Sequence, residues 1–143
     1  MKQILLIADG DSELSELYRQ LLTQRGYEVE TASDGLDCLK KLRQVTPDAL
    51  VLDLALPWGG GDGVLDWIRD VIPSHAIPVI LTATAGFSLD LAEFRKPPVV
   101  GYLPKPFSLT ALLESVRSAF AKQGRRETSN LQPVPALSGL FVG

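Results

Sequence analysis

The sequence of 143 residues has few of the side chains that several common kinds of site require. It contains one cysteine, Cys38, and one histidine, His75. A single cysteine excludes an internal disulfide and a cysteine-built zinc site, and a single histidine excludes a multi-histidine metal site. No apolar run approaches the roughly 20 residues of a membrane span, and Met1 is not followed by a signal-peptide-like stretch. We therefore expect a cytoplasmic protein that has no membrane partner.

Positive charge is also scarce. The chain has 14 Lys and Arg against 17 Asp and Glu, a formal charge of −3, so a broad basic face for a nucleic-acid backbone is not expected. With 45% hydrophobic and 22% charged residues the composition is typical of a globular domain. We expect Cys38 to pack in its core. His75 lies in a predicted loop between two prolines and is expected to have no role.

Short apolar runs alternate with longer amphipathic stretches along the chain. The runs are residues 4–8, 49–52, 77–81 and 99–103, and residues 27–31 are predicted as a further short strand with Val29 as its apolar centre. Continuous apolar runs of this length are typical of parallel strands buried on both faces. The pattern predicts an α/β fold, a doubly wound five-stranded parallel sheet whose right-handed crossovers place helices on both faces.

The amphipathic stretches predict the helices and their boundaries. The predicted N-caps are Ser12, Asp34 and Ser108. Leu36, Leu39 and Leu42 predict the inner stripe of the second helix. Residues 54–63 are predicted as a glycine-rich loop, and residues 89–94 as a short helix.

Composition changes near the end of the chain. Residues 1–123 are predicted to form one domain, and residues 124–143, polar at first and then interrupted by prolines, a C-terminal tail or linker stub. Leu137, Leu140 and Phe141 are unusual in a solvated tail, which leaves open that this segment docks on the domain or on a partner.

Polar residues end four of the predicted strands. Asp9, Asp53 and Thr82 follow the first, third and fourth strands, and Lys105 lies just past the fifth. The carboxyl ends of parallel strands meet at one sheet edge, so these side chains should converge. An aspartate can attack phosphorus to form an acyl phosphate, whose oxygens a hydroxyl and an ammonium can bind while a divalent cation neutralises charge.

At this point the sequence resembles the receiver domain of two-component response regulators, over about residues 2–122. The matching segments are Ile4–Asp9, Leu50–Pro57, Val79–Ala83 and Tyr102–Phe107. The resemblance implies a flavodoxin-like (βα)5 fold of strand order 2-1-3-4-5. It also implies a single-domain response regulator that is not an enzyme beyond self-phosphorylation or dephosphorylation.

The resemblance assigns roles to particular residues. It implies that Asp53 accepts a phosphoryl group from a histidine kinase or a histidine phosphotransfer protein. Thr82 and Lys105 would bind that group, and Thr82 and Tyr102 would form the switch. Lys105-Pro106 would be a cis peptide. A downstream protein partner would bind the face made by the fourth helix, the fifth strand and the fifth helix.

The metal site implied by the resemblance departs from the family pattern. Mg²⁺ would be held by Asp9, Asp53 and the backbone carbonyl of Ala55, but the second acidic residue after the first strand is replaced by Gly10. Fewer anionic ligands should weaken binding of a hard cation. Asp11 is a further candidate ligand for Mg²⁺. Its place in the sequence, however, is expected to point its side chain toward the start of the first helix.

The loop after Asp53 also departs from the family. It is two residues longer than the family pattern and contains Gly59, Gly60 and Gly61, which predicts a mobile or strongly turned segment. Trp58 in this loop either lies over the site as a lid or covers an apolar edge.

Three functions therefore remain open. The first is a phosphorylatable receiver that signals through its surface, and the second is a pseudo-receiver that binds protein without phosphorylation. The third is a phosphatase similar to haloacid dehalogenases, suggested by Asp9-Gly10-Asp11, although that family expects a threonine where this chain has Glu13.

Overall fold

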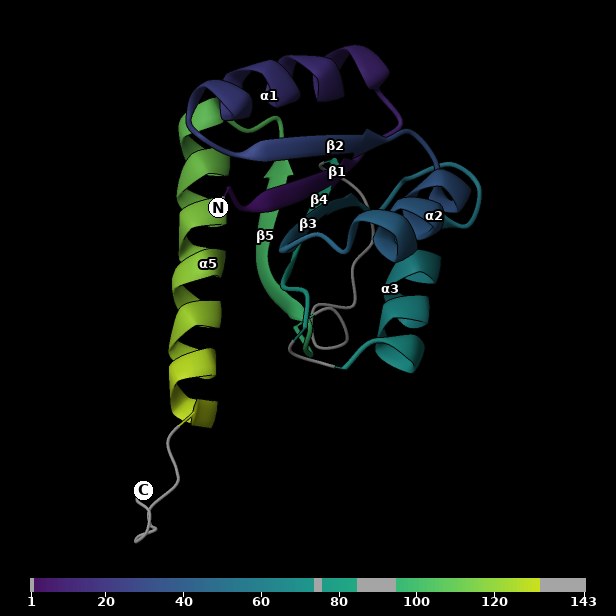
Figure 1. Ribbon diagram of the computed structural model, residues 1–143. Helices are drawn as coiled ribbons and strands as arrows, with labels where there is room; N and C mark the ends of the chain where they lie inside the picture. Colours follow the sequence, from purple (N-terminus) through teal and green to yellow (C-terminus); the bar gives the residue numbers. More distant parts are fainter. Residues whose placement is uncertain (1, 74–75, 85–94, 132–143) are drawn as a thin grey trace, which may run out of the picture.

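Five parallel strands form one sheet in the spatial order β2-β1-β3-β4-β5 (Figure 1). The strands are β1 (Ile4–Ala8), β2 (Glu28–Ala32), β3 (Ala49–Asp53), β4 (Val79–Thr84) and β5 (Val99–Lys105). This computed structural model describes residues 2–73, 76–84 and 95–131, and side chains as far as Ala121 in the last helix. The predicted parallel sheet and strand order are confirmed.

Helices cover both faces of the sheet, as predicted. The helices α1 (Ser12–Gln24) and α5 (Leu109–Leu131) lie against one face, and α2 (Gly35–Val45) and α3 (Gly60–Val71) against the other (Figure 1). Side chains alternate along each strand, so Leu6 of β1 packs under α2 and α3 while Leu5 packs under α1 and α5. Both are fully buried, which explains the continuous apolar run.

The bounds of β1 are those predicted, whereas one or both ends of the other four strands differ by one to three residues. β2 begins one residue later than predicted, at Glu28, and β4 covers Val79–Thr84. Thr82 therefore lies inside β4 and pairs with Asp53 of β3. Lys105 is the last residue of β5, where the prediction placed it just past the strand. Ladder pairing with neighbouring strands extends β4 and β5 beyond their apolar residues.

The helix starts differ more. Asp11, not Ser12, is the N-cap of α1, because its carboxylate accepts a hydrogen bond from the Leu14 amide at 3.1 Å. Asp34 and Ser108 cap α2 and α5 as predicted, accepting from the amides of Asp37 and Ala111. The predicted glycine-rich loop is shorter than expected, since α3 begins at Gly60.

The last helix continues beyond Gln123, where the predicted domain ended, to Leu131. Most residues between 124 and 131 are compatible with a helix, and the one glycine among them costs only about 1 kcal/mol. The division into a domain of residues 1–123 and a tail of residues 124–143 stays a prediction. The apolar residues 137–142, the predicted helix at 89–94 and His75 lie outside the described residues.

Two predictions about the second helix have opposite outcomes. Cys38 is fully buried, as expected, and burial raises the pKa of its thiol to about 12. Leu36 does not join the inner stripe and is 67% exposed. The buried positions of α2 are 35, 38 and 42, and one residue of helix turns the chain by about 100°, which carries Leu36 off that face. No helix in the described ranges is long and apolar enough to cross a membrane.

Candidate functional site

Two buried aspartates lie side by side at the carboxyl edge of the sheet. Asp9 directly follows β1, and Asp53 ends β3, the strand paired with β1 through Ala8 and Leu52. Their exposed fractions are 5% and 6%. Burying two carboxylates together is unfavourable unless a cation or hydrogen-bond donors compensate their charge.

Lys105 supplies that compensation. Its Nζ lies 2.7 Å from Asp9 Oδ2 and 3.2 Å from Asp53 Oδ2. Burial lowers the pKa of the Lys105 ammonium, but the hydrogen bond to Asp9 and the charges of Asp9 and Asp53 outweigh burial and hold that pKa above its usual value. The lysine therefore stays charged between the two carboxylates.

Backbone amides fix the other oxygen of each carboxylate. The Asp11 amide donates to Asp9 Oδ1 at 2.9 Å, and the Ala55 amide donates to Asp53 Oδ1 at 3.0 Å. Each carboxylate is thus held from both sides, by an amide two residues along the chain and by Lys105. This arrangement positions the Asp53 carboxylate at the end of its strand.

Thr82 and Tyr102 lie beside this group at different depths. Thr82 is 2% exposed, pairs with Asp53, and accepts a hydrogen bond from the Leu54 amide through its carbonyl at 2.9 Å. Tyr102 pairs with Leu81, one register position away, and is 40% exposed. The Lys105-Pro106 peptide is cis, as the resemblance implied. The predicted convergence of Asp9, Asp53, Thr82 and Lys105 on one edge is therefore present.

Asp11 is turned away from this group. Its carboxylate caps α1, as described above, rather than facing Asp53. Gly10 is exposed, and a Cβ added to it would lie 3.0 Å from Pro57 Cδ. Among the described residues, no three carboxylate, imidazole or thiol groups come close enough to hold a metal ion. The side-chain donors available for Mg²⁺ are thus Asp9 and Asp53.

The segment between β3 and α3 borders the site. The Gly35 amide donates to the Pro57 carbonyl at 2.7 Å, which ties this segment to the start of α2. Trp58 has a φ of 56° and Gly59 a φ of 106°, so the chain turns sharply before α3. Trp58 is 73% exposed, so only a small part of its side chain is buried, and its role as a lid or as the cover of an apolar edge stays a prediction.

One residue that positions the site escaped the sequence reasoning. A Cβ added to Gly61 would lie 2.5 Å from the Asp53 carbonyl oxygen and 2.7 Å from Leu54 Cα. The missing side chain lets the first turn of α3 lie directly against the end of β3. The run of three glycines signalled a special turn, but not which glycine is in contact with the site.

Comparison with known proteins decides the family. The sequence model of the response regulator receiver domain matches residues 5–117. The chain belongs to the response regulator receiver family. This membership, together with the capping role of Asp11, leaves the phosphatase interpretation of Asp9-Gly10-Asp11 without support.

Several known receivers are similar over most of their length. The polar-differentiation response regulator DivK of Brucella anthropi is 28% identical over 117 residues, which are 82% of this chain and 94% of that protein. The chemotaxis response regulator CheY4 of Vibrio cholerae has a TM-score of 0.74 at 25% identity, covering 83% of this chain and 99% of that one. A CheY-like receiver from Methanospirillum hungatei JF-1 shares the fold with a TM-score of 0.76 at 23% identity, covering 88% and 99%.

Proposed function

We propose that this receiver domain accepts a phosphoryl group on Asp53 from a histidine kinase or a histidine phosphotransfer protein. The observation that carries the proposal is the Lys105 ammonium bonded to both Asp9 and Asp53 at the carboxyl edge of the sheet. A cation already placed beside Asp53 can neutralise the negative charge that a phosphoryl group brings. Receiver domains in general act with such phosphodonor proteins and with downstream partners.

In the transfer reaction the main task of the receiver is to hold the Asp53 carboxylate in position beside the phosphorus. An Asp53 carboxylate oxygen attacks the phosphorus of a phosphohistidine on the partner. The new P–O bond forms as the P–N bond breaks, and the imidazole nitrogen leaves with the bonding electron pair. The product is an acyl phosphate on Asp53. Before transfer the Ala55 amide holds Asp53 Oδ1 and Lys105 holds Oδ2, so a donor lies beside either oxygen that attacks.

Neighbouring side chains would bond to the acyl phosphate and change position in response. It adds roughly two negative charges next to Thr82 and Lys105, whose hydroxyl and ammonium can bond the phosphoryl oxygens. Movement of Thr82 toward the phosphoryl group opens space that Tyr102 can enter from the surface. Under this proposal the exposed position of Tyr102, which is 40% exposed, would belong to the unphosphorylated protein. The face of β5 and α5 on which the change appears would bind the downstream protein.

Mg²⁺ is the cofactor that this function implies. Asp9, Asp53 and the carbonyl of Ala55 would hold it, in keeping with the preference of this ion for one or two carboxylates together with phosphate oxygens and water. When bound, Mg²⁺ would supply further neutralisation of phosphoryl charge. Because Gly10 offers no carboxylate, we expect weaker Mg²⁺ binding than in receivers with two consecutive acidic residues.

Beryllofluoride, which mimics a phosphoryl group on a carboxylate, tests the proposal. Titration in the presence of Mg²⁺ should change the fluorescence of Trp58, which lies in the segment next to the site, and the change should saturate. Asp53→Asn should abolish the response, while Asp66→Asn, an exposed aspartate on α3, should leave it intact. Phosphorylation by acetyl phosphate, measured by mass spectrometry, should show the same dependence.

A pseudo-receiver is the second candidate, and one observation favours it. The Lys105 ammonium neutralises the charge of both carboxylates without a metal ion, and Gly10 provides no third carboxylate. The site is therefore stable when no phosphoryl group is bound. This function predicts no response to beryllofluoride at any Mg²⁺ concentration, together with partner binding that Asp53→Asn leaves unchanged. A saturable response lost in Asp53→Asn would exclude it.

A further inference from the structure

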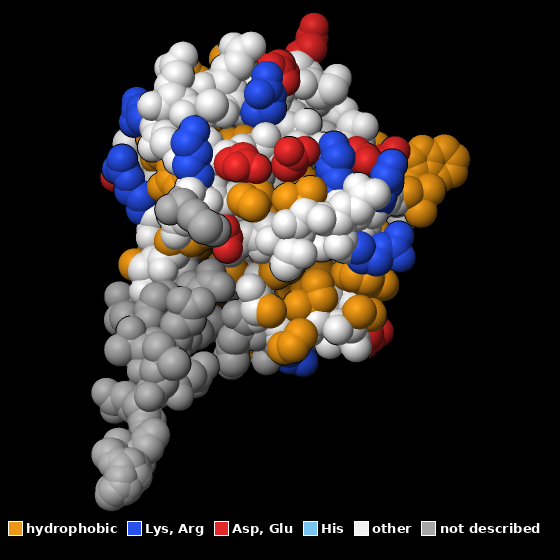
Figure 2. Space-filling view, in the orientation of Figure 1, with side chains coloured by type: hydrophobic (Ala, Val, Ile, Leu, Met, Phe, Trp, Pro, Cys, Tyr) orange, Lys and Arg blue, Asp and Glu red, His pale blue; other side chains and the backbone are white. Residues whose placement is uncertain are grey.

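Three exposed apolar side chains lie together beside the acidic site. Trp58 is 73% exposed and Leu36 is 67% exposed, and Pro57 is exposed as well. They meet because the Gly35 amide donates to the Pro57 carbonyl at 2.7 Å, which holds the segment before α3 against the start of α2. Figure 2 shows hydrophobic side chains projecting at the right edge of the view, where Figure 1 places α2. We call Leu36, Pro57 and Trp58 the Trp58 patch.

The stability of the fold does not account for Trp58. Its backbone has a φ of 56°, in the left-handed region that disfavours a bulky side chain. Because most of the residue is exposed, burial of its side chain offsets little of this strain. A strained aromatic residue in an exposed apolar patch is typical of a surface that contacts another molecule.

The Trp58 patch is continuous with the phosphoacceptor site. Ala55, whose amide donates to Asp53 Oδ1, is exposed and lies in the same segment as the patch. Pro57 is also adjacent to Gly10, the residue that follows Asp9, since a Cβ added to that glycine would lie 3.0 Å from Pro57 Cδ. The patch therefore borders the segments that carry both buried carboxylates.

A protein that brings a phosphohistidine to Asp53 covers at least part of this patch. Trp58 is five residues beyond Asp53, a separation of at most about 18 Å for a fully extended backbone. The Leu56 amide donates to the Asp53 carbonyl, so the chain turns back and the true separation is shorter. A standard interface covers about 800 Å² on each partner, which is a disc of roughly 16 Å radius.

The size of the patch favours a transient partner over a second copy of this chain. An aromatic side chain buries about 150–250 Å² in a contact. Three side chains, of which Trp58 is the largest, therefore fall well short of the about 800 Å² per partner that a stable dimer needs. A brief encounter uses a smaller contact, and tryptophan is among the residue types that dominate binding energy at interfaces.

We propose that the Trp58 patch is a docking surface for an apolar pocket on the protein that carries the phosphohistidine. Trp58 is then a specificity-determining residue for transfer to Asp53, because it holds the donor protein and takes no part in the chemical step. This inference rests on the proposed phosphoryl transfer. It adds which surface of the receiver recognises the donor.

Comparison of protein donors with a small donor tests the proposal. The protein donors are the histidine kinases and histidine phosphotransfer proteins of the source organism, each phosphorylated on histidine, and the small donor is acetyl phosphate. With the most active protein donor, Trp58→Asn should lower kcat/KM by about tenfold or more, mainly through KM, the scale of an interface hot spot. Leu36→Ala should lower it by a smaller factor. Acetyl phosphate has no protein surface to dock, so its labelling rate should be unchanged in both variants.

Two controls separate docking from folding. Asparagine tolerates a φ of 56°, so Trp58→Asn should not lower the midpoint of thermal unfolding. Val71 is 59% exposed and lies at the far end of α3, where the donor does not reach. Transfer from the protein donor to Val71→Ala should therefore match transfer to the wild type.

The outcomes distinguish this inference from the proposed function. If the wild type and Trp58→Asn accept the phosphoryl group equally well from the protein donor, the docking role is wrong and the proposed function stands. A changed rate of acetyl phosphate labelling in Trp58→Asn would also overturn the docking role, because it would indicate a lid over the site. If no protein donor phosphorylates the wild type, the proposed function fails and the docking role fails with it.

Discussion

At the scale of single residues, the acidic site depends on Lys105. Its ammonium reaches across from β5 to the carboxylates that end β1 and β3, and it is the cation that the structure places between them. Removing it leaves two adjacent buried carboxylates with only one backbone amide each. The lysine thus stabilises the fold as well as preparing Asp53 for a phosphoryl group.

Lys105→Met should lower the free energy of unfolding by about 2 kcal/mol at neutral pH, the scale of charge-assisted hydrogen bonds. The folded-state pKa of Lys105 is raised, so its contribution is fully present below the unfolded lysine pKa of about 10.4 and is lost as pH rises through the folded value. The free energies of unfolding of the wild type and Lys105→Met, measured with urea, should therefore converge only at pH values above the raised folded-state pKa, higher than about 10.4. Lys40→Met, an exposed lysine on α2, should match the wild type throughout.

Gly10 is the position at which the metal site of this receiver lacks a carboxylate. Gly10→Asp should tighten Mg²⁺ binding by about tenfold, because a third carboxylate adds ligand charge. The new Cβ would approach Pro57 Cδ at 3.0 Å, so we expect a stability loss of about 1 kcal/mol. Isothermal titration with Mg²⁺ measures the affinity. Gly10→Asn introduces the same steric contact without the charge, and equal Mg²⁺ affinity in both variants would contradict the prediction.

At the scale of elements, the connection between β3 and α3 sets the position of Asp53. Trp58 and Gly59 turn the chain through the left-handed region, and the Pro57 carbonyl is tied to the start of α2. The chain can then begin α3 against the end of β3. The left-handed backbone conformation destabilises a residue as bulky as tryptophan by on the order of 1–3 kcal/mol. Trp58 keeps this conformation because the neighbouring contacts hold it.

Two glycines of α3 make a matched test of this arrangement. Gly61→Ala places a methyl group 2.5 Å from the Asp53 carbonyl, and nothing lies within 4 Å of a Cβ at Gly63. We expect Gly61→Ala to destabilise by about 1–3 kcal/mol and to slow phosphorylation of Asp53. Gly63→Ala should instead stabilise by roughly 0.5–1 kcal/mol through helix propensity. Thermal unfolding and acetyl phosphate labelling measure both effects, and equal behaviour of the two variants would refute the contact.

The same elements show what sequence could and could not predict. The existence of the nine described strands and helices follows from apolar runs and caps, because those patterns are local. The start of α3 does not, because glycine has no intrinsic preference that reveals a tertiary contact such as that of Gly61 with Asp53. Leu36 was misplaced for a related reason, since a leucine in the first turn of a helix looks equally compatible with either face.

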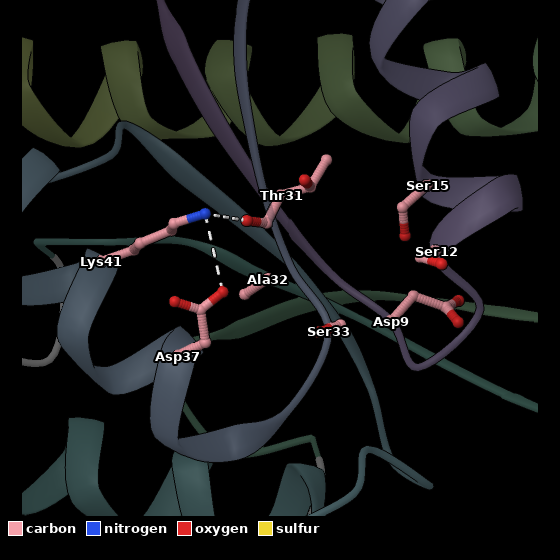
Figure 3. A pocket seen from close by; sticks show the side chains of 8 residues that line it. All are labelled: Asp9, Ser12, Ser15, Thr31, Ala32, Ser33, Asp37 and Lys41. Carbon is pink, nitrogen blue, oxygen red and sulfur yellow. Dashed lines mark hydrogen bonds and ion pairs between the residues drawn. The ribbon is translucent and has the colours of Figure 1, made fainter.

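At the scale of the whole molecule, two cores share one sheet. The core under α2 and α3 contains Leu6, Leu52 and Leu65, and the core under α1 and α5 contains Leu5, Ile80 and Leu112. Sequence predicted this layout because only a sheet covered on both faces accounts for continuous apolar strands. The convergence of the site residues followed from the same topology. The pocket between the starts of α1 and α2, lined by Ser12, Thr31 and Asp37 among others (Figure 3), was not predictable, because its shape depends on how side chains of separate elements pack and not on strand topology.

Because every strand contributes to both cores, the two layers should unfold together. Leu65→Ala and Leu112→Ala, each on a different face, should both lower the free energy of unfolding by about 2–5 kcal/mol. Fluorescence of Trp67, which packs against the core under α2 and α3, and far-ultraviolet circular dichroism should give coincident urea transitions for either variant. Leu36→Ala, at a 67% exposed position, should change stability by no more than about 0.5 kcal/mol. If Leu112→Ala shifted the dichroism transition and not the Trp67 transition, the two layers would be independent, and a signal at Asp53 could not be transmitted through a single cooperative sheet.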